Sequence, residues 1–378
     1  MQVLKGYPQK CIFEQPILTN YMNIAEIAAY LLSILILVPT AASISRFDQW
    51  WIRDFDFPRL QISILILAVL IYSAVAFDFS SIWEIIMIVL LALSFLYQSV
   101  KIYPYTFFSS KQVKMYHGQD VERQISILVS NVLTTNTRYD KLIQIIIREN
   151  PDLVLTLESD KTWEKELQAI EEEYPYTVKI PLKNLYGMHL YSKLELEDID
   201  IKYLISKEIP SIHGKVKLRT GEKINIHCLH PKPPSPSEDD TSTNRDAELL
   251  LVGKSIDGDN STLVFGDLND VAWSRTTKLF LQLSGLLDPR IGRGFYNTFH
   301  AEYPIFRWPL DHVFHSSDFM LLKLKRLEKM GSDHFPMFIK LVYQPENENA
   351  NKEFEEPEAE EEEWVEEKIE KGKNSEAH

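Results

Sequence analysis

The stretch GSDHFPMFIKLV, residues 331–342, is the most informative part of this sequence for its fold. Its apolar second half predicts a β-strand over 335–342, and this strand begins directly after Asp333 and His334. An aspartate can bind a metal ion or orient a water molecule, and an imidazole can hydrogen-bond to a phosphoryl oxygen. The stretch therefore predicts a strand that starts at a candidate phosphate site, but an Asp-His pair by itself has low specificity.

Four further predicted strands end at short polar side chains. They cover 124–130, 152–157, 223–229 and 261–265, and they end at Asn131, Glu158, His230 and the turn Gly266-Asp267-Leu268-Asn269, respectively. A short strand over 309–314 contains Asp311, and a helix is predicted over 139–150. Because polar residues at strand ends collect at one edge of a sheet, these side chains predict a cleft at that edge.

Three apolar segments precede this strand-rich region and predict transmembrane helices over about 24–44, 60–77 and 82–100. Residues 27–44 and 60–77 are each 18 residues long without a charge, and 85–100 form a third run of 16. A helix needs about 20 largely apolar residues to cross a bilayer. Because the first run starts late and two more follow it, a cleaved signal peptide is disfavoured.

Composition sets the remaining boundaries. We expect an N-terminal segment at 1–22, the three transmembrane helices within 23–100, a polar linker at 101–122, a folded domain at 123–343 and an acidic disordered tail at 344–378. Residues 346–378 contain 14 acidic and 4 basic side chains, so they carry −10 of the net charge of −14. A segment with this charge and few apolar residues favours disorder.

Basic residues near the membrane favour one orientation. If the connection between the first two spans faces the cytoplasm, that side carries six basic residues and the other side carries two. The six are Arg46, Arg53, Arg59, Lys101, Lys111 and Lys114; the two are Lys5 and Lys10. The positive-inside rule then predicts a multi-pass protein of the cell (inner) membrane with its folded domain in the cytoplasm.

Charge and cysteine content exclude some functions. Residues 121–344 carry a net charge of −4, so the predicted domain lacks the basic footprint of a tight duplex-binding protein. The two cysteines, Cys11 and Cys228, form neither a metal-finger spacing nor a disulfide framework.

The order Asn131, Glu158, His230, Gly266–Asn269, Asp311 and Ser332-Asp333-His334 resembles that of the endonuclease/exonuclease/phosphatase superfamily. This superfamily includes deoxyribonuclease I, exonuclease III-like enzymes, sphingomyelinases and inositol polyphosphate phosphatases. The resemblance covers about 121–343, and the stretch 266–336 resembles a bacterial membrane-anchored branch of the superfamily. It implies an α/β (α+β) fold, a four-layer α/β/β/α sandwich of the deoxyribonuclease I-like type, here preceded by three transmembrane helices.

The resemblance also implies a metal site. Asn131 and Glu158 would hold a divalent cation, and Asp333 would be a further ligand or would orient water. Mg²⁺ suits such a site because it binds through few carboxylates and keeps several waters, and Mn²⁺ is an alternative.

Five residues would contact or serve the reacting phosphate by the same resemblance. Asp267 would orient or deprotonate the attacking water, and Asn269 would hold a phosphoryl oxygen. His334 would donate a hydrogen bond to the phosphoryl group, with Asp311 orienting its ring, and His230 would supply a second imidazole. Strand alternation places His227 and His312 on the opposite faces of their strands, where we expect them to pack.

The segment before the strand at 309–314 is rich in basic and aromatic residues. Arg290, Arg293 and Arg307 are candidate substrate-binding residues because a guanidinium can hold a phosphate through two hydrogen bonds. Tyr296 and Trp308 lie in the same segment and could contact a base. An ordinary solvated loop is the alternative for all five residues.

These observations predict a membrane-anchored, divalent-metal-dependent hydrolase of phosphate esters, first of all a phosphodiesterase of the nuclease type. An alternative is a phosphatase or phospholipase acting on lipid head groups, and a further alternative is a non-catalytic scaffold that keeps the fold. The expected partners are a phosphate-ester substrate, either nucleic acid or a lipid or small phosphodiester, and the lipid bilayer. No obligate protein partner is expected.

Overall fold

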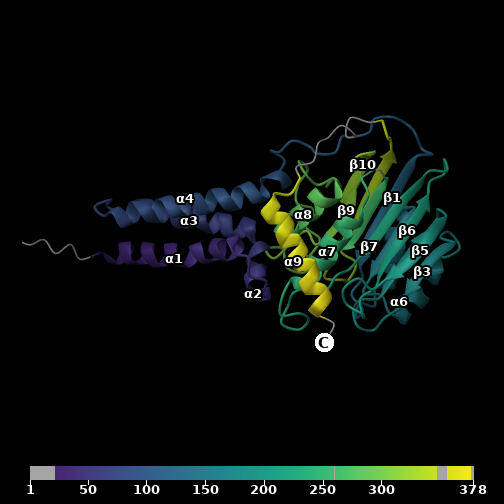
Figure 1. Cartoon of the computed structure of the whole chain (residues 1–378), viewed down its shortest axis with the longest axis horizontal. Coiled ribbons are helices and arrows are strands. Elements are labelled where there is room, and N and C mark those ends of the chain that lie inside the picture. Colours follow the sequence, from purple (N-terminus) through teal and green to yellow (C-terminus); the bar gives the residue numbers. More distant parts are fainter. Residues whose placement is uncertain (1–21, 259, 347–355, 376–378) are drawn as a thin grey trace, which may run out of the picture.

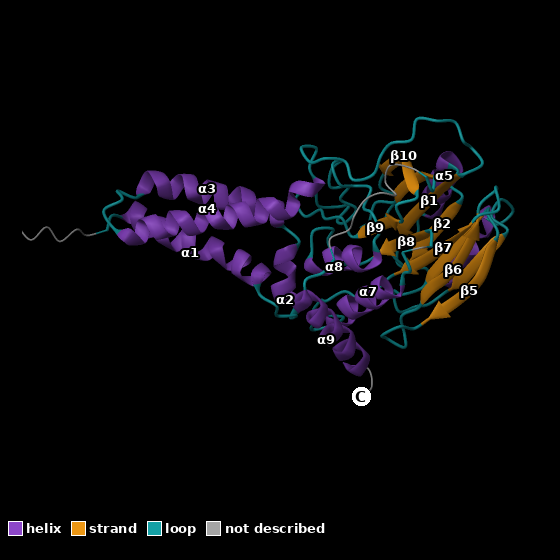
Figure 2. Cartoon of the chain, turned by 45° about the horizontal axis from the view of Figure 1, so that its top comes forward, coloured by secondary structure: helices purple, strands orange, loops and turns teal. Residues whose placement is uncertain are grey.

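The chain forms a bundle of long apolar helices joined at one end to a domain of two β-sheets (Figures 1 and 2). This computed structural model describes residues 22–258, 260–346 and 356–375. The predicted N-terminal segment 1–22 lies outside the described residues except for Met22. The bundle projects away from the sheets (Figure 1), and a buried cluster of Ile102, Tyr105 and Trp273 joins its near end to the domain.

The bundle consists of α1 (Ile24–Ile44), α3 (Arg59–Ala76) and α4 (Ile82–Ile102). Each is long and apolar enough to cross a membrane, with mean hydropathies of 2.2, 2.0 and 2.1 over the spans, and they match the three predicted segments. Asn23 and Ser81 cap α1 and α4, and each forms a capping box with a glutamate three residues later. Local sequence thus specifies where these two helices begin.

Buried polar contacts join the three helices near the domain. Arg59 of α3 donates to Gln98 of α4 at 2.8 Å, and Gln98 donates to Thr40 of α1 at 3.1 Å. Asp56 accepts a hydrogen bond from Ser43 at 2.6 Å and also pairs with Arg59. A buried charge requires such partners, so the contacts hold the domain-side ends of the helices in one arrangement.

The connection between α1 and α3, residues 45–58, contains two short helices, α2 (Trp50–Arg53) and η1 (Asp54–Asp56). It packs on the domain rather than hanging free. The Trp50 N–H donates to the Asp240 carbonyl at 3.0 Å, and the Ser242 N–H donates to the Asp48 carbonyl at 2.8 Å. The three apolar helices and the domain are therefore joined here as well as through the end of α4.

The domain contains eleven strands among its described residues. Their bounds are β1 Gln124–Asn131, β2 Leu153–Leu157, β3 Tyr176–Ile180, β4 Met188–Ser192, β5 Leu196–Lys202, β6 Ser211–Lys217, β7 Lys223–Leu229, β8 Thr262–Asp267, β9 Asp311–His315, β10 Phe319–Arg326 and β11 Met337–Tyr343. One sheet has the order β10-β11-β1-β2-β4-β3, and the other has the order β5-β6-β7-β8-β9. The neighbours β1 and β2 are parallel, as are β7 and β8, whereas the other pairs are antiparallel.

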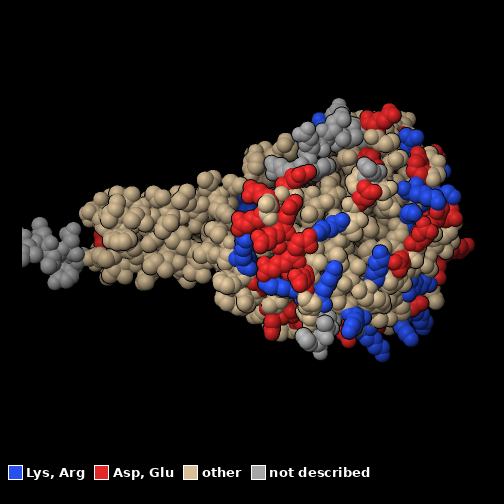
Figure 3. Space-filling view, viewed as in Figure 1, with Lys and Arg blue, Asp and Glu red and all other residues tan. Residues whose placement is uncertain are grey.

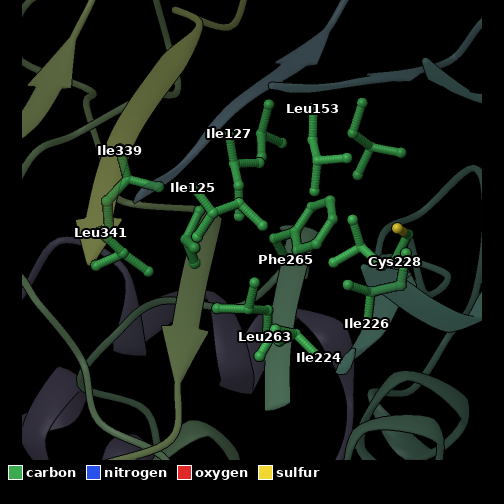
Figure 4. Close-up of a cluster of buried hydrophobic side chains, with 14 of the residues drawn as sticks. Ile125, Ile127, Leu153, Ile224, Ile226, Cys228, Leu263, Phe265, Ile339 and Leu341 are labelled. Carbon is green, nitrogen blue, oxygen red and sulfur yellow. The ribbon is translucent and has the colours of Figure 1, made fainter. Parts of the chain in front are cut away.

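The two sheets pack face to face through alternate residues of their strands. Buried side chains from both sheets form one apolar core, part of which is shown in Figure 4. In β1 the inward residues are Ile125, Ile127 and Val129, and in β8 they are Leu263 and Phe265. Successive strand residues point to opposite faces, so odd-numbered positions of β1 and β8 face the core.

Helices cover the outer faces of both sheets. Their bounds are α5 Tyr139–Glu149, α6 Lys161–Glu166, η3 Leu167–Ile170, α7 Thr243–Ser255 and α8 Arg275–Ser284. Leu142 of α5 and Trp163 of α6 share a buried cluster with Leu128 of β1, whereas Leu249 of α7 shares one with Val264 of β8. The result is the predicted four-layer α/β/β/α sandwich with three apolar helices before it.

The predicted linker at 101–122 is part of the folded structure. Helix α4 continues to Ile102 and is followed by η2 (Tyr103–Tyr105), whose Tyr105 hydroxyl donates to the Ala272 carbonyl at 2.6 Å. Further on, Val113 is buried, and the Tyr116 N–H donates to the Leu321 carbonyl of β10 at 2.8 Å. The polar composition of residues 101–122 did not indicate this packing, because main-chain pairing with a sheet edge needs no apolar side chains.

The prediction of a disordered tail is wrong for residues 359–375. These residues form α9 (Ala359–Ser375), which packs on α7 and α8 (Figure 1). Its buried face carries Trp364, Val365 and Ile369, and its acidic residues gather on the outer surface (Figure 3). Composition favoured disorder, but a few apolar residues on one helical face suffice when folded helices supply the other half of the contact.

Candidate active site

A cavity of about 630 Å³ opens at the edge of the sandwich that adjoins the membrane helices. It is lined by the ends of core strands, by loops of the domain and by the connection between α1 and α3. The lining residues are Asp54, Phe57, Pro58, Asn131, Glu158, Leu185, Tyr186, His230, Pro233, Pro234, Ser235, Ser237, Glu238, Asp267, Asn269, Phe299, Phe306, Trp308, Leu310, Asp333 and His334.

Two surfaces of this cavity differ in chemistry. We call one the polar floor, which consists of Asn131, Glu158, His230, Asp267 and His334. We call the other the aromatic wall, which consists of Phe57, Phe299, Phe306 and Trp308.

Strand alternation explains most of the polar floor. Asn131 and Asp267 continue the inward-facing series of β1 and β8, and His230 follows Cys228, an inward residue of β7, by two positions. Their side chains therefore point between the sheets, just beyond the apolar core. Asn131, Asp267 and His230 are 1%, 1% and 3% exposed, so the floor is an extension of the protein interior.

Gly266 is required where β8 passes β7. Its φ is +153°, and a Cβ at this position would collide with the backbone of Leu229 on the neighbouring strand. Only glycine permits this close approach, which places Asp267 at the level of His230. The Gly-Asp-Leu-Asn turn therefore needs glycine at its first position for a steric reason.

Glu158 breaks the alternation of its strand. Its φ is +58°, a left-handed conformation that is uncommon outside glycine, and the Thr134 hydroxyl donates to its carbonyl at 2.7 Å. The turn brings the carboxylate to Asn131, whose side-chain amide lies 2.8 Å from Glu158 Oε1 and 3.1 Å from Asp267 Oδ2. Asn131 therefore links the two carboxylates.

One oxygen of Glu158 is shielded from solvent without a protein donor. Within the described residues, its Oε2 atom has no hydrogen-bond partner. Burial raises the pKa of Glu158 to about 7, and the charges of Asp333 and Asp267 act in the same direction. A buried carboxylate oxygen without a partner is stabilised when it binds a proton or a cation.

His334 is the centre of a hydrogen-bonded acid–imidazole group. Its Nδ1 lies 2.8 Å from Asp311 Oδ2, and its Nε2 lies 3.5 Å from Asp267 Oδ2. Burial by itself lowers the pKa of His334, but the charges of Asp311 and Asp267 outweigh it and raise the pKa to about 10. The ring is therefore a cation at neutral pH, held with one N–H toward the cavity.

The second imidazole, His230, has the opposite character. Burial lowers its pKa, although the charge of Asp267, 4.0 Å away, partly offsets this effect. The ring of Tyr186 lies beside it with centroids 5.4 Å apart. At neutral pH the floor therefore presents one charged and one neutral imidazole.

Asn269 and Asp333 also lie at the cavity. The Asn269 N–H donates to Asp267 Oδ1 at 3.0 Å, and its side-chain amide donates to the Pro231 carbonyl at 3.0 Å. Arg245 donates to the Asn269 carbonyl at 2.9 Å from outside the cavity. Asp333 is positioned by its carbonyl, which accepts from Ala301 N–H at 2.6 Å. Asn269 thus fixes the turn that carries Asp267.

The structure does not bring the three predicted substrate-binding arginines to the cavity. Arg290 is fully buried and pairs with Asp288 at 2.8 Å, so it cannot reach a substrate and its prediction is wrong. Arg293 donates to the Pro289 carbonyl at 3.1 Å, and Arg307 donates to the His300 carbonyl at 3.1 Å. Sequence could not reveal that local backbone acceptors would occupy these guanidinium groups.

Sequence reasoning also missed most of the cavity outside the polar floor. Asp54, Phe57 and Pro58 come from the connection between membrane helices, more than 70 residues before Asn131 in the chain. Tyr186 lies in the turn before β4, and its hydroxyl donates to Glu238 at 2.9 Å. A motif at a strand end identifies the floor, but no local pattern marks a residue that lines the site only through packing.

The donors of the floor fit a hard divalent cation. The cavity is lined by Asp54, Glu158, Glu238, Asp267 and Asp333, and among its described residues it has no lysine or arginine. Glu158 would hold the ion, since its Oε2 is available and shielded. The predicted ligand Asn131 directs its amide NH₂ group at Glu158 and Asp267. Its Oδ1 accepts from the Leu133 N–H, so Asn131 orients these carboxylates in this arrangement. Oxygen ligands of this kind suit Mg²⁺ or Mn²⁺.

A second group of ligand atoms lies next to Asn131 and Glu158. Asp267, Asp311 and His334 each offer one ligand atom, all within 4.8 Å of one another, so they too could hold an ion. The Nδ1 of His334 already lies at hydrogen-bonding distance from Asp311. We therefore assign Asp311 to the imidazole and leave Asp267 as the residue shared between the two groups.

A sequence profile of the Endonuclease/Exonuclease/phosphatase family matches residues 128–334. Since this match spans more than half of the 378 residues, the chain belongs to that family, whose members hydrolyse phosphoester bonds. The match begins within β1 and ends at His334, so it contains the whole polar floor. A search of curated protein sequences found no match.

Solved structures resemble the domain at low sequence identity. D. rerio TDP2 complexed with a single-strand DNA product is 18% identical, with a TM-score of 0.48 over 58% of this chain and 98% of that one. The human Nocturnin catalytic domain with a bound sulfate is 15% identical, with a TM-score of 0.49 over 60% and 97%. An endonuclease/exonuclease/phosphatase from Beutenbergia cavernae is 14% identical, with a TM-score of 0.47 over 59% and 72%.

Proposed function

We propose that this protein is a membrane-anchored phosphodiesterase that depends on a divalent cation, Mg²⁺ or Mn²⁺. The observation that carries the proposal is the polar floor, where five residues from separate segments meet with one shielded carboxylate oxygen unpaired. An anionic phosphate ester would be repelled by the five carboxylates of the cavity unless a cation neutralised them. When bound, the cation would stabilise charge on the phosphoryl oxygens.

The floor residues divide the remaining work. Asp267 Oδ2 lies beside both Asn131 and His334, where it orients a water molecule and accepts its proton. The water oxygen forms a bond to phosphorus, the ester P–O bond breaks, and the leaving alkoxide takes a proton from solvent, which gives an alcohol and a phosphomonoester. His334 donates its Nε2–H to a phosphoryl oxygen, and Asp311 keeps its ring oriented and charged. His230 is a neutral second donor or acceptor at the same phosphate.

We also propose that the domain, 123–343, faces the cytoplasm. The connection 45–58 and the segment after α4 contact the same domain, so their six basic residues lie on one side of the membrane. A reporter that is active only outside the cytoplasm, fused to the C-terminus, should be inactive. Reporter activity equal to that of an exported control would place the domain on the other side.

The direct test uses the full chain in detergent micelles. We expect hydrolysis of bis(p-nitrophenyl) phosphate with Mg²⁺ or Mn²⁺, and its loss with a chelator and in the double variant Asp267→Asn, His334→Ala. Failure of the wild-type chain to hydrolyse this ester or bind Mn²⁺ in calorimetry would favour the scaffold alternative. A full-length chain is needed because Tyr105 and α9 pack on the domain.

A further inference from the structure

The connection between the first two membrane helices forms part of the candidate active site. Asp54, Phe57 and Pro58 line the same cavity as Asp267 and His334. Pro58 is directly followed by Arg59, the first residue of the membrane helix α3. One side of the cavity is therefore continuous with a helix that is long and apolar enough to lie in a bilayer.

This connection is fixed to the catalytic turn. The indole N–H of Trp273 donates to the Asp56 carbonyl at 2.7 Å, and Trp273 lies six residues after Asp267. The Asp56 carboxylate accepts from Ser43 of α1 at 2.6 Å. Membrane helix, connection and catalytic turn therefore form one packed unit, in which Phe57 has a defined place.

An exposed apolar loop lies next to the same opening, close to Phe57 and the start of α3. Tyr303, Ile305 and Phe306 are 60%, 70% and 57% exposed, and Pro304 lies between them. The side chain of Gln61 in α3 donates to the Ile305 carbonyl at 2.5 Å. The loop 303–306 is thus at the level where α3 enters the bilayer, a place where exposed apolar side chains are stabilised by lipid.

Aromatic contacts continue from this level to the polar floor. The ring of Trp308 contacts Phe57 at a centroid distance of 5.7 Å, and it lies 6.2 Å from both Phe306 and Phe299. Phe299 in turn lies 5.0 Å from the His334 ring. The aromatic wall therefore leads from the membrane surface to the imidazole at the floor.

The charges of the cavity select against a polyanion. Its lining carries five acidic side chains and, in the described part of the chain, no lysine or arginine. Each phosphate beyond the one at the floor would meet unfavourable charge, whereas nucleic-acid sites use basic side chains to neutralise the backbone. An apolar group attached to a single phosphate would instead find the aromatic wall.

We propose that the substrate is an amphiphilic lipid of the bilayer, which carries one phosphodiester group and a long apolar tail. Its phosphate occupies the polar floor, and its tail lies along the aromatic wall toward α3 and the loop 303–306. This inference rests on the proposed phosphodiesterase function and adds the class of substrate and the residues that recognise it.

The test compares two diesters that share one reacting group, p-nitrophenyl hexadecyl phosphate and p-nitrophenyl methyl phosphate. Both are assayed with the full chain and Mg²⁺ in the same uncharged detergent micelles, with p-nitrophenol release as the readout. We expect kcat/KM for the hexadecyl ester to exceed that for the methyl ester by about 100-fold, since its chain concentrates it in the micelles that hold the protein and also contacts the wall.

Variants of the aromatic wall separate recognition from partition into micelles. Phe57→Ser and Phe306→Ser should each lower kcat/KM for the hexadecyl ester about tenfold and change the methyl-ester value less than about twofold. Phe108→Ser is the matched control, because Phe108 is 87% exposed and lies outside the cavity lining. It should leave both values and their ratio unchanged.

The outcomes distinguish this inference from the proposed function. Methyl-ester hydrolysis that needs Mg²⁺ and Asp267, combined with an equal rate on the hexadecyl ester, would overturn the amphiphile and retain the phosphodiesterase. The amphiphile would also be overturned, and the phosphodiesterase retained, by equal losses on both esters in Phe57→Ser and Phe306→Ser. Faster cleavage of a single-stranded oligonucleotide than of the hexadecyl ester would have the same meaning. Absence of hydrolysis of all three substrates would overturn both proposals.

Discussion

The polar floor and the aromatic wall line one cavity but are built in different ways. Four of the five floor residues stand at or next to the end of a core strand, and His334 lies three residues before β11. The wall brings Phe57, from between two membrane helices, to Phe299, Phe306 and Trp308, from a loop about 240 residues later. In this protein, strand ends specify the residues at the reacting phosphate, whereas packing between distant segments creates the remaining substrate contacts.

The two regions should also respond differently to substitution. A floor residue acts on the reacting phosphate, so its loss should affect every substrate. A wall residue contacts only the part of a substrate that differs between esters, so its loss should be selective.

The largest effect is expected at Asp267. Asp267→Asn keeps the size of the side chain but removes the proton acceptor next to His334 and Asn131. We expect kcat/KM to fall by about 1,000-fold or more, the scale of losing one transition-state stabiliser, on both the methyl and the hexadecyl esters. A loss on only one ester, measured by p-nitrophenol release, would contradict a common floor.

The next effect is expected on metal affinity. Glu158→Gln removes the carboxylate whose shielded Oε2 has no partner among the described residues, so Mn²⁺ affinity in calorimetry should weaken about 10–100-fold. Because burial raises the pKa of Glu158 to about 7, a proton competes with the metal below that pH. Wild-type affinity should therefore increase between pH 6 and 8, and the variant should lose this dependence. Unaltered affinity in Glu158→Gln would move the metal to the Asp267, Asp311 and His334 group.

A smaller effect is expected on the pH dependence of kcat/KM, through the floor residue His334. Against the effect of burial, Asp311 and Asp267 raise the pKa of His334 to about 10, so Asp311→Asn should lower this pKa. The alkaline decline in kcat/KM should then begin at a correspondingly lower pH. In the wild-type chain, the charged ring stabilises the fold fully below its unfolded pKa of about 6.5, and this stabilisation is lost as pH rises through about 10. An unshifted alkaline limb in the pH–rate profile would exclude Asp311 as the partner that controls His334.

The smallest effect is expected at the anchor of the wall. Trp273→Phe removes the 2.7 Å hydrogen bond to the Asp56 carbonyl, a contact worth about 1 kcal/mol. We expect KM for the hexadecyl ester to rise severalfold with kcat nearly constant, since the floor keeps its own contacts. If kcat for the methyl ester falls as well, floor and wall are coupled through the turn 267–273, and the distinction between them fails.

Sequence patterns predicted much of the fold because the strong apolar runs of the sequence form helices and strands in the structure. The spans at 24–44, 60–77 and 82–100 and the strands at β1, β2, β7, β8, β9 and β11 are all present. Five strands, β3, β4, β5, β6 and β10, were not predicted. Of these, β3, β5 and β10 lie at sheet edges, where side chains meet water and the apolar pattern weakens, as in LEDIDIK of β5. Strand β4 is buried but only five residues long, and β6 contains Gly214 and three basic or imidazole side chains.

Prediction failed for residues whose partners are remote in sequence. Arg290 was predicted to bind phosphate, but the fold buries it against His312 and Tyr105, with Asp288 as its ion-pair partner. The acidic segment 359–375 looked disordered, but α7 and α8 offered an apolar groove for Trp364 and Ile369. In both cases the deciding contact joins surfaces that meet only after folding.

By itself, the sequence determined the class of fold, the three apolar helices and the set of polar residues that meet at the cavity. It could do so because period-two alternation and strand-end polarity are local properties of the chain. Only the tertiary structure decided that Glu158 turns toward Asn131 and that Phe57 faces the same cavity. These relations depend on sheet pairing and on docking of the membrane connection against Trp273, which no single segment encodes.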